Sequence, residues 1–409
     1  MRAFRSAART SALLAALACR ETGPTEPPPV LQSLPRTLTD GERRAIEAAN
    51  GFAFALLKRI DQRGADSTQF VSPLSISMAL GMALQGARGS TLDAMRATLG
   101  FGSMTGEEIG ASYRGLIDLL RGLDRQVEFE LANSMWVNQN FAVDPAFAEV
   151  ARRYFAAETG DLDFTAPSSV TTINTWVSDK TRGRITSILE SIDPQEVLFL
   201  LNAIYFKGTW REGFDPAQTS DASFSGSGAP QSIRLMHRKG MMPYHDAEGF
   251  EAVDLSYGAA AYSMTVLLPK EGRTVNDLVQ SLTPEVWSAM TTGFHQAEVD
   301  LFLPAFRLEY QRSLKDDLSS LGISAAFDPR EADFAGIGAD LFLTRVEHKT
   351  YVEVDEAGTT AAAVTGVGVG VVSLPRQVTF RVDRSFMFAL RERLSGTILF
   401  LGKVTRLPD

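Results

Sequence analysis

An α+β fold is predicted for this chain, because helical patterns come mostly first and strand patterns dominate after residue 230. An α/β fold would instead alternate helices and strands regularly along the sequence. The 409 residues are 44% hydrophobic and 22% charged, which is an ordinary globular composition. Length alone allows two or three domains. However, no Pro-, Ser- or Gly-rich linker divides the chain after residue 40, so we expect one domain over residues 40–409.

The helices are predicted from apolar spacing. Phe52, Leu56 and Ile60 recur every four residues and would lie on one face of a first helix. Residues 72–86 are apolar on nearly every side, which predicts a buried helix. A Ser-x-x-Asp capping pattern at residues 90–93 predicts a further helix over residues 90–99. Residues 170–183 also have a helical pattern, which ends near Gly183.

The strands are predicted from alternation and from continuous apolar runs. Residues 127–131 alternate apolar side chains with glutamates, which is typical of a half-buried strand. Residues 196–210 form a long apolar run and predict a strand buried on both faces. Later strand patterns cover residues 251–257, 261–269, 297–310, 350–356, 377–383, 386–392 and 396–404. The last two are joined by Leu394–Thr397, which has the composition of a hairpin turn.

The N-terminus has the pattern of a secretion signal. Three arginines precede the short apolar run of residues 11–19, which is too short to span a bilayer. Residues 16–19 read Ala-Leu-Ala-Cys and resemble a bacterial lipobox, in which Cys19 would be lipidated. An ordinary secretory signal cut after Ala18 is the alternative. Residues 1–19 are therefore expected to be a signal, and the Pro-rich residues 20–39 a flexible tether.

This N-terminus predicts a secreted protein, or a membrane-anchored lipoprotein that faces the periplasm or the extracellular space. Contact with a membrane is expected only through such a lipid anchor, and a stable anchor needs more than one acyl chain. Cys19 is the only cysteine, so no internal disulfide is expected in the mature protein.

The sequence lacks the motifs of several enzyme classes. The four histidines, of which His348 is the last, do not have the spacing of an H-E-x-x-H zinc site. The sequence has no G-x-S-x-G elbow, no S-x-x-K pattern and no P-loop. We therefore predict a protein that is not an enzyme and holds no metal or cofactor. A net charge of -9 argues against nucleic acid as a partner.

The order of eight sequence motifs between Asn50 and Pro408 resembles the serpin family, of an inhibitory and bacterial type. The motifs lie at residues 50–60, 70–95, 131–137, 173–185, 201–214, 301–334, 346–363 and 398–408. The resemblance implies a serpin fold of three β-sheets with about eight or nine helices and an exposed reactive-centre loop, residues 357–376. It also implies a mechanism. A target serine protease cleaves the loop, which then inserts as a strand into the main sheet and traps the protease as an acyl-enzyme.

The composition of this loop fits insertion. No charged residue lies between Glu356 and Arg376, so insertion would bury no charge. Every second residue from Thr359 to Val371 is Ala, Thr or Val, whereas the other parity carries small residues and three glycines. Since strand side chains alternate between faces, one face of the loop can pack on a core. The alternative is a flexible Gly-rich loop or an exposed strand that does not insert.

By resemblance, the hinge at the start of the loop matches inhibitory serpins except at Thr360, where many inhibitors have Glu. The hinge residues are Glu356, Gly358, Thr359, Thr360, Ala361, Ala362 and Ala363. The family's usual loop length places the reactive bond at Val372-Ser373, and an error of one residue is open. Valine fits the shallow apolar pocket of elastase-like or subtilisin-like proteases, whereas a trypsin-like pocket would leave its buried Asp unpaired.

Two further groups carry over from the family. Ser72, Ser75, Asn202 and His348 match the shutter, a hydrogen-bonded cluster beneath the main sheet. Trp210 and Glu356 match the breach, where insertion begins; plain core packing is the alternative for Trp210. We expect a monomer whose partner is a target serine protease. A non-inhibitory serpin with a binding or chaperone-like role, and a cross-class inhibitor of papain-like cysteine proteases, are the alternatives.

Overall fold

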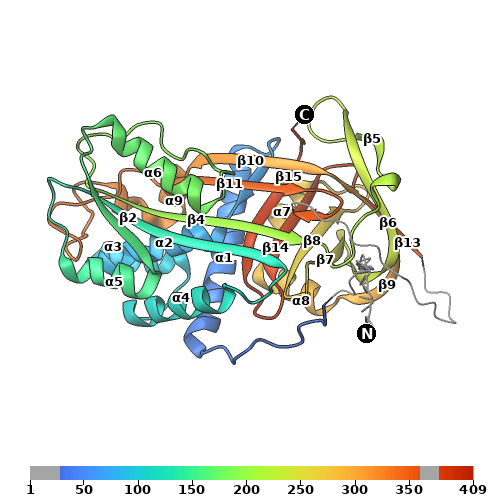
Figure 1. The fold of residues 1–409 in the computed structure, drawn as a ribbon, viewed down its shortest axis with the longest axis horizontal. Coiled ribbons are helices and arrows are strands. Elements are labelled where there is room, and N and C mark those ends of the chain that lie inside the picture. Colours follow the sequence, from blue (N-terminus) through green and yellow to red (C-terminus); the bar gives the residue numbers. More distant parts are fainter. Residues whose placement is uncertain (1–27, 360–376, 409) are drawn as a thin grey trace, which may run out of the picture.

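The computed structural model describes residues 28–359 and 377–408, and it is an α+β fold (Figure 1). Within these residues the strands form three sheets, of nine, four and two strands. The same residues form nine α-helices. The predicted fold class, three sheets with eight or nine helices, is therefore confirmed. None of the described helices is long and apolar enough to cross a membrane.

The helices begin where the sequence supplies caps. α1, Asp40–Arg63, starts with a capping box in which Thr39 and Glu42 bond each other's backbone N–H groups. Its predicted face is buried at Phe52, Leu56 and Ile60. The remaining helices are α2 (Pro73–Gly86), α3 (Gly89–Leu99), α4 (Gly106–Leu120), α5 (Pro145–Phe155), α6 (Pro167–Lys180), α7 (Val275–Ser281), α8 (Pro284–Thr292) and α9 (Lys315–Leu318).

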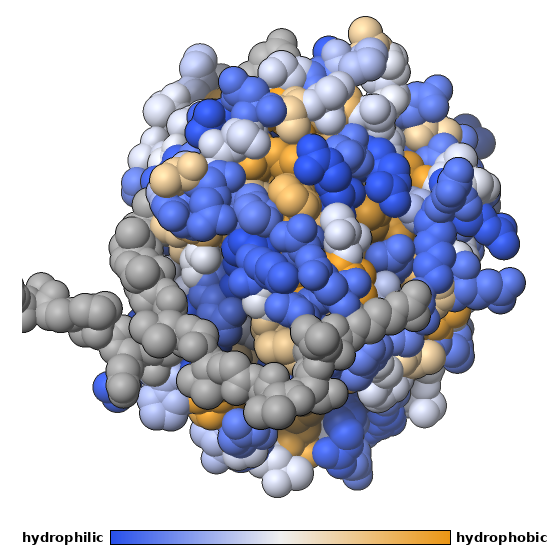
Figure 2. All heavy atoms as spheres, turned by 90° about the vertical axis from the view of Figure 1, so that its right-hand side faces the viewer, coloured by the Kyte–Doolittle hydropathy of each residue, from blue (hydrophilic) through white to orange (hydrophobic). Residues whose placement is uncertain are grey.

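The nine-stranded sheet has the order β1-β15-β14-β8-β7-β6-β9-β13, with β5 paired to β6. Its strands are β1 (Gln69–Val71), β5 (Ser220–Phe224), β6 (Gln231–Asp246), β7 (Phe250–Ser256), β8 (Tyr262–Pro269), β9 (His295–Pro304), β13 (Val378–Arg381), β14 (Phe386–Glu392) and β15 (Ile398–Val404). Figure 2 views the end of the molecule that carries β6, β9 and β13, where hydrophilic side chains cover most of the surface.

The four-stranded sheet has the order β12-β4-β2-β3, and β10 and β11 form a separate antiparallel pair. Their bounds are β2 (Val127–Asn138), β3 (Ala157–Leu162), β4 (Leu198–Thr209), β10 (Phe306–Ser313), β11 (Glu347–Val354) and β12 (Gly358–Thr359). The single strand predicted over residues 297–310 is wrong. Two strands occupy this segment: β9 ends at Pro304, and β10 starts at Phe306 and pairs with β11 in another sheet. The N–H of Ala305 still donates to the carbonyl of Arg234 at 2.9 Å, one step further in the β6–β9 register, so the chain leaves the first sheet only after Ala305.

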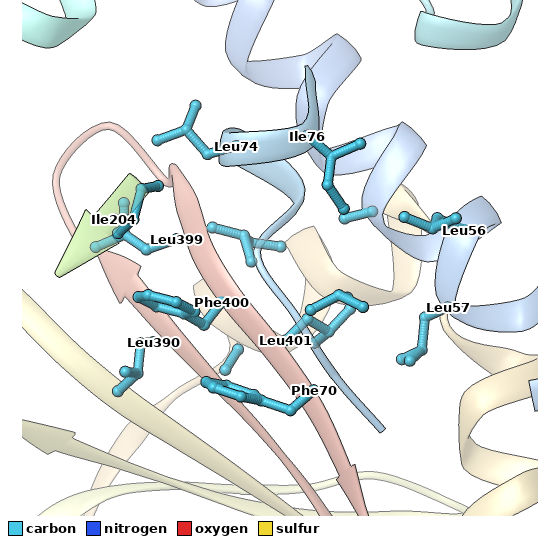
Figure 3. Packing of buried hydrophobic residues seen from close by; sticks show 14 of the residues in the cluster. Leu56, Leu57, Phe70, Leu74, Ile76, Ile204, Leu390, Leu399, Phe400 and Leu401 are labelled. Carbon is cyan, nitrogen blue, oxygen red and sulfur yellow. The ribbon is translucent and has the colours of Figure 1, made fainter. Parts of the chain in front are cut away.

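The main core lies between the helices and the nine-stranded sheet. Figure 3 shows Leu56 and Leu57 of α1 and Leu74 of α2 facing Phe400 and neighbouring side chains of β15. Phe70 of β1 stacks on Phe400 with ring centroids 5.3 Å apart. A second, smaller apolar cluster packs α6 against one face of the four-stranded sheet. Its members include Ile173, Trp176, Phe199, Leu201 and Ala203.

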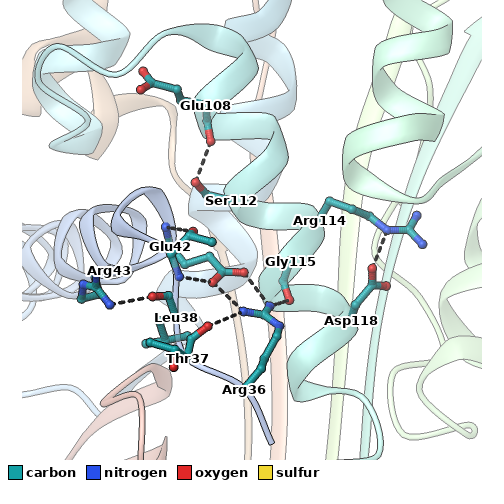
Figure 4. Close-up of polar contacts among 11 residues, drawn as sticks. Arg36, Thr37, Leu38, Glu42, Arg43, Glu108, Ser112, Arg114, Gly115 and Asp118 are labelled. Carbon is teal, nitrogen blue, oxygen red and sulfur yellow. Dashed lines mark hydrogen bonds and ion pairs between the residues drawn. The ribbon is translucent and has the colours of Figure 1, made fainter. Parts of the chain in front are cut away.

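Part of the predicted tether is held against the body. Arg211 donates to the carbonyl of Pro28 at 2.7 Å, and Arg393 donates to that of Leu31 at 3.0 Å. Further along, Arg36 forms two hydrogen bonds with Glu42, at 2.8 and 2.6 Å (Figure 4). Residues 28–38 are thus held by two arginines of the folded domain and by their own Arg36, which bonds Glu42 of α1. Residues 1–27, including the predicted signal and Cys19, lie outside the described residues.

Candidate functional site

A slot lies between the edges of two strands, β4 and β11, that belong to different sheets. Within the described residues, β11 pairs only with β10, and β4 pairs with β2 along one edge. The other edge of β4 pairs with β12 at two residues only. A cleft of about 310 Å³ lies between residues 198–202 of β4 and 347–349 of β11, and α2 forms its floor. We call the space between these two strand edges the slot.

The chain reverses direction at the head of the slot. Asp355 accepts hydrogen bonds from the N–H groups of Ala357 and Gly358, both at 3.0 Å, and burial raises the pKa of its carboxyl group. After this turn β12 runs antiparallel to β4, with Gly358 opposite Thr209 and residue 359 opposite Gly208. The first two residues after the turn therefore already extend the sheet.

Only glycine fits at position 358. Its φ of +146° lies in a region that L side chains rarely adopt. In addition, a Cβ atom there would lie 2.2 Å from the carbonyl oxygen of Gly208 and 2.8 Å from the Cα atom of Thr209. Because both contacts are to backbone, no side-chain rotation relieves them. The turn and its pairing with β4 thus depend on this one residue.

The predicted breach residues lie against this turn. Trp210 is 2% exposed and stacks on Tyr257, with ring centroids 4.3 Å apart. Its indole N–H donates to the carbonyl of Asp355 at 2.9 Å, and its backbone N–H donates to that of Ala357 at 2.8 Å. The carboxylate of Glu356 accepts from the hydroxyl of Thr219 at 2.8 Å. Trp210 is therefore both packed in the core and bonded to the hinge.

The predicted shutter residues lie under the slot in two hydrogen-bonded groups. In the first, Nε2 of His348 accepts from the N–H of Ser72 at 3.0 Å, and the Ser72 hydroxyl donates to the carbonyl of Leu399 at 2.7 Å. Burial of His348 lowers its pKa to about 3. The ring is thus neutral at physiological pH, as an acceptor nitrogen must be.

The second group contains a residue that the sequence analysis missed. Ser75 donates to the carbonyl of Asn202 at 3.5 Å, and the Asn202 amide donates to Oδ1 of Asn133 at 2.7 Å. Asn133 in turn donates to the carbonyl of Phe155 at 2.6 Å. Asn133 lies directly opposite Asn202 in the β2–β4 register. The signal that could have pointed to it is an amide side chain in the mostly apolar motif of residues 131–137.

The other predicted site residues lie outside the described residues. They are Thr360, Ala361, Ala362 and Ala363 of the hinge, Val372 and Ser373 of the reactive bond, and Cys19. Thr219 and Asp355, which hold the turn, were also missed, because their partners are distant in sequence and neither has a distinctive pattern. Among the described residues no group of three or more His, Cys, Asp or Glu side chains can hold a metal ion.

Comparisons with known proteins agree on one family. The family model described as "Serpin (serine protease inhibitor)" matches residues 47–407. The chain is 35% identical to Iripin-2 of Ixodes ricinus, covering 90% of this chain and 94% of that protein. It is 32% identical to Intracellular coagulation inhibitor 1 of Tachypleus tridentatus, covering 90% of each.

Solved structures give the same result. The thermophilic serpin Tengpin in its native state matches with a TM-score of 0.82 and 29% identity, over 94% of this chain and 98% of that chain. Human thyroxine-binding globulin in complex with thyroxine also has a TM-score of 0.82, with 28% identity over 90% of this chain and 100% of that chain. The matching motifs, the three sheets and these relatives together establish that the chain belongs to the serpin family, whose members are generally protease inhibitors.

Proposed function

We propose that this protein inhibits a serine protease as a suicide substrate. The protease cuts the loop at Val372-Ser373, and the cut loop enters the slot between β4 and β11 while the acyl bond still holds. The single observation that carries the proposal is the turn at the head of the slot, where β12 already runs antiparallel to β4 and the rest of that edge of β4 is unpaired among the described residues.

The register of β12 makes the proposal specific. Continuing it one residue at a time brings residue 369 opposite Leu198, the first residue of β4. The loop up to Val372 is thus long enough to cover the whole strand. Odd-numbered loop residues come opposite even-numbered β4 residues, among them Ile204 and Phe206 of the main core. This is the parity that carries Ala, Thr and Val, so the insertable face of the loop would meet the core.

Valine at the reactive bond favours an elastase-like or subtilisin-like target, because a shallow apolar pocket binds it well. The protein is proposed to work outside the cytoplasm, either secreted or anchored through a lipid on Cys19. Labelled palmitate should be incorporated into the wild-type protein and not into Cys19→Ser. Absence of labelling in the wild type would contradict the anchor and leave secretion.

Mixing the protein with elastase tests the inhibitory proposal. We expect a covalent complex that survives SDS, because the protease is trapped while esterified to the loop. An elastase that lacks its active-site serine is the control and should give no complex. Complete cleavage of the loop without a complex would contradict the proposal. The same gel with papain tests the cross-class alternative.

A binding role without inhibition is the second candidate. The observation that favours it is the similarity to human thyroxine-binding globulin, whose name describes a protein that binds thyroxine. Such a protein need not insert its loop. A loop that is cut by elastase without a complex, together with a melting temperature that cutting leaves unchanged, would support this candidate over inhibition.

A further inference from the structure

The segment between α6 and β4, residues 181–197, is fixed to the β4 side of the slot; we call it the connector. Oδ1 of Asn174 in α6 accepts from the N–H groups of Ile188 and Leu189 at 2.8 and 3.0 Å. The side chains of Ile188 and Leu189 belong to the apolar cluster that includes Phe199 and Leu201 of β4. Movement of β4 away from β11 would therefore carry the connector with it.

At the far end of the slot, the connector is bonded to the residues that lead into β11. Glu196 is 6% exposed. One of its carboxylate oxygens accepts from the Thr344 hydroxyl at 2.8 Å, and the other accepts from Nη2 of Arg345 at 2.8 Å. Nη2 also donates to the carbonyl of Ser191 at 2.8 Å. The guanidinium lies 5.0 Å from the ring centroid of Phe199 in β4. We call this group the far-end clasp.

Nearer the hinge, the connector is bonded to β11 itself. Arg184 lies 3.1 Å from the carboxylate of Glu353 and donates to the hydroxyl of Tyr351 at 3.2 Å. The same hydroxyl donates to Glu353 at 2.9 Å. The Arg184 and Glu353 side chains are 35% and 32% exposed, so this hinge-end clasp is more hydrated than the far-end one. The two clasps join the two sides of the slot at different heights.

We propose that these clasps set the rate at which the slot opens, and that Glu196 is a positioning residue for inhibition; this rests on the proposed function. Inserting one strand between β4 and β11 adds about 4.8 Å to their separation. A hydrogen bond of 2.8 Å does not survive a displacement of that size. The loop strand must therefore break the hinge-end clasp and then the far-end clasp before insertion is complete.

The far-end clasp dominates this barrier. An ion pair between partly exposed side chains contributes little, because water and ions screen it. Glu196, in contrast, is buried, and opening the slot takes away Arg345 and Thr344 together. A buried carboxylate that loses its cation is strongly destabilised. The final part of insertion, which carries the protease furthest, is therefore the part that Glu196 opposes.

The test compares Glu196→Gln and Arg345→Gln with a matched control, Glu42→Gln. Glu42 is also a buried glutamate bonded to an arginine, Arg36, but it lies on α1 away from the slot (Figure 4). The first measurement follows insertion of the uncut loop. Protein is warmed below its melting temperature, and the rate is recorded at which it becomes resistant to a urea concentration that unfolds the starting form. We expect this rate to be about tenfold higher in both slot variants, which corresponds to an activation barrier about 1.4 kcal/mol lower. Glu42→Gln should lower stability without this acceleration.

The second measurement is the number of inhibitor molecules consumed for each elastase inhibited. Faster insertion traps more acyl-enzyme, so this number should fall in the slot variants, whereas general destabilisation does not lower it. Arg345→Lys keeps the charge and should recover part of the wild-type rate. In the double variant, the two effects on the insertion rate should add to less than their sum, because both changes remove the same contact between Glu196 and Arg345.

The outcomes separate the two proposals. If the wild type forms the elastase complex and the slot variants match Glu42→Gln in both measurements, the proposed role of the clasps is overturned and the inhibitory function stands. If the wild type neither forms the complex nor gains urea resistance after its loop is cut, insertion does not occur and both proposals are overturned.

Discussion

At the scale of single residues, the hinge turn depends on the absence of a side chain at Gly358. We expect Gly358→Ala to unpair residues 358–359 from β4, because its Cβ would overlap the backbone of Gly208 and Thr209. Elastase should then cut the loop with much less complex formed. Gly240→Ala is the matched control, since a Cβ at that strand glycine meets no atom within 4 Å. Equal complex formation by both variants would show that the turn does not matter.

The choice of target protease is also expected to depend on one residue, the one that precedes the reactive bond. Val372→Arg should redirect inhibition from elastase to trypsin, because a cation at this position would pair with the buried Asp of a trypsin-like pocket. The change is read from complex formation with each protease and from mass spectrometry of the released fragment. Val371→Arg is the matched variant one position away. If that variant switched specificity instead, the bond would lie at residue 371.

At the scale of elements, His348 of β11 joins α2 and β15 beneath the slot, and its burial gives stability a pH dependence. The folded pKa is about 3, whereas an unfolded histidine titrates near 6.5. Between these values the unfolded chain binds more protons, so stability falls as the pH is lowered below about 6.5, by up to about 1.4 kcal/mol per unit. Urea unfolding at pH 7 and pH 5 should show a smaller difference for His348→Gln than for the wild type.

The elements also show what sequence reasoning can reach. Apolar periodicity was enough for α1 and a continuous apolar run was enough for β4, because both patterns are local in the sequence. This reasoning failed at Ala305, where the chain passes from β9 to β10 in another sheet, because the strands that pair with the two halves, among them β6 and β11, are distant in sequence. Asn133 and Thr219 were missed for the same reason, since their partners come from other elements. The separate β4 and β11 edges, on which the site depends, arise only from the arrangement of whole sheets.

At the scale of the whole molecule, the edges of β4 and β11 lie on the two sides of the slot, and separating them would let one more strand pair with β4. Cutting the loop should therefore raise the melting temperature, because the inserted strand would pair along β4 and bury its odd-numbered side chains. Calorimetry before and after limited cleavage measures this. A melting temperature unchanged by cleavage in the wild type would mean that the slot is not filled.

The variant Thr359→Arg tests whether the rise in melting temperature after cleavage comes from insertion of the loop. Residue 359 pairs with Gly208, and a side chain on that face at 208 would meet the rings of Tyr257 and Phe206. A guanidinium held there would be buried without a partner, which costs several kcal/mol. The cut variant should show little or no rise, and elastase should use it as a substrate. Thr360→Arg, on the opposite parity, is the matched control and should retain most of the rise, since its side chain would face away from this core. Equal behaviour of the two variants would contradict the parity on which the insertion proposal depends.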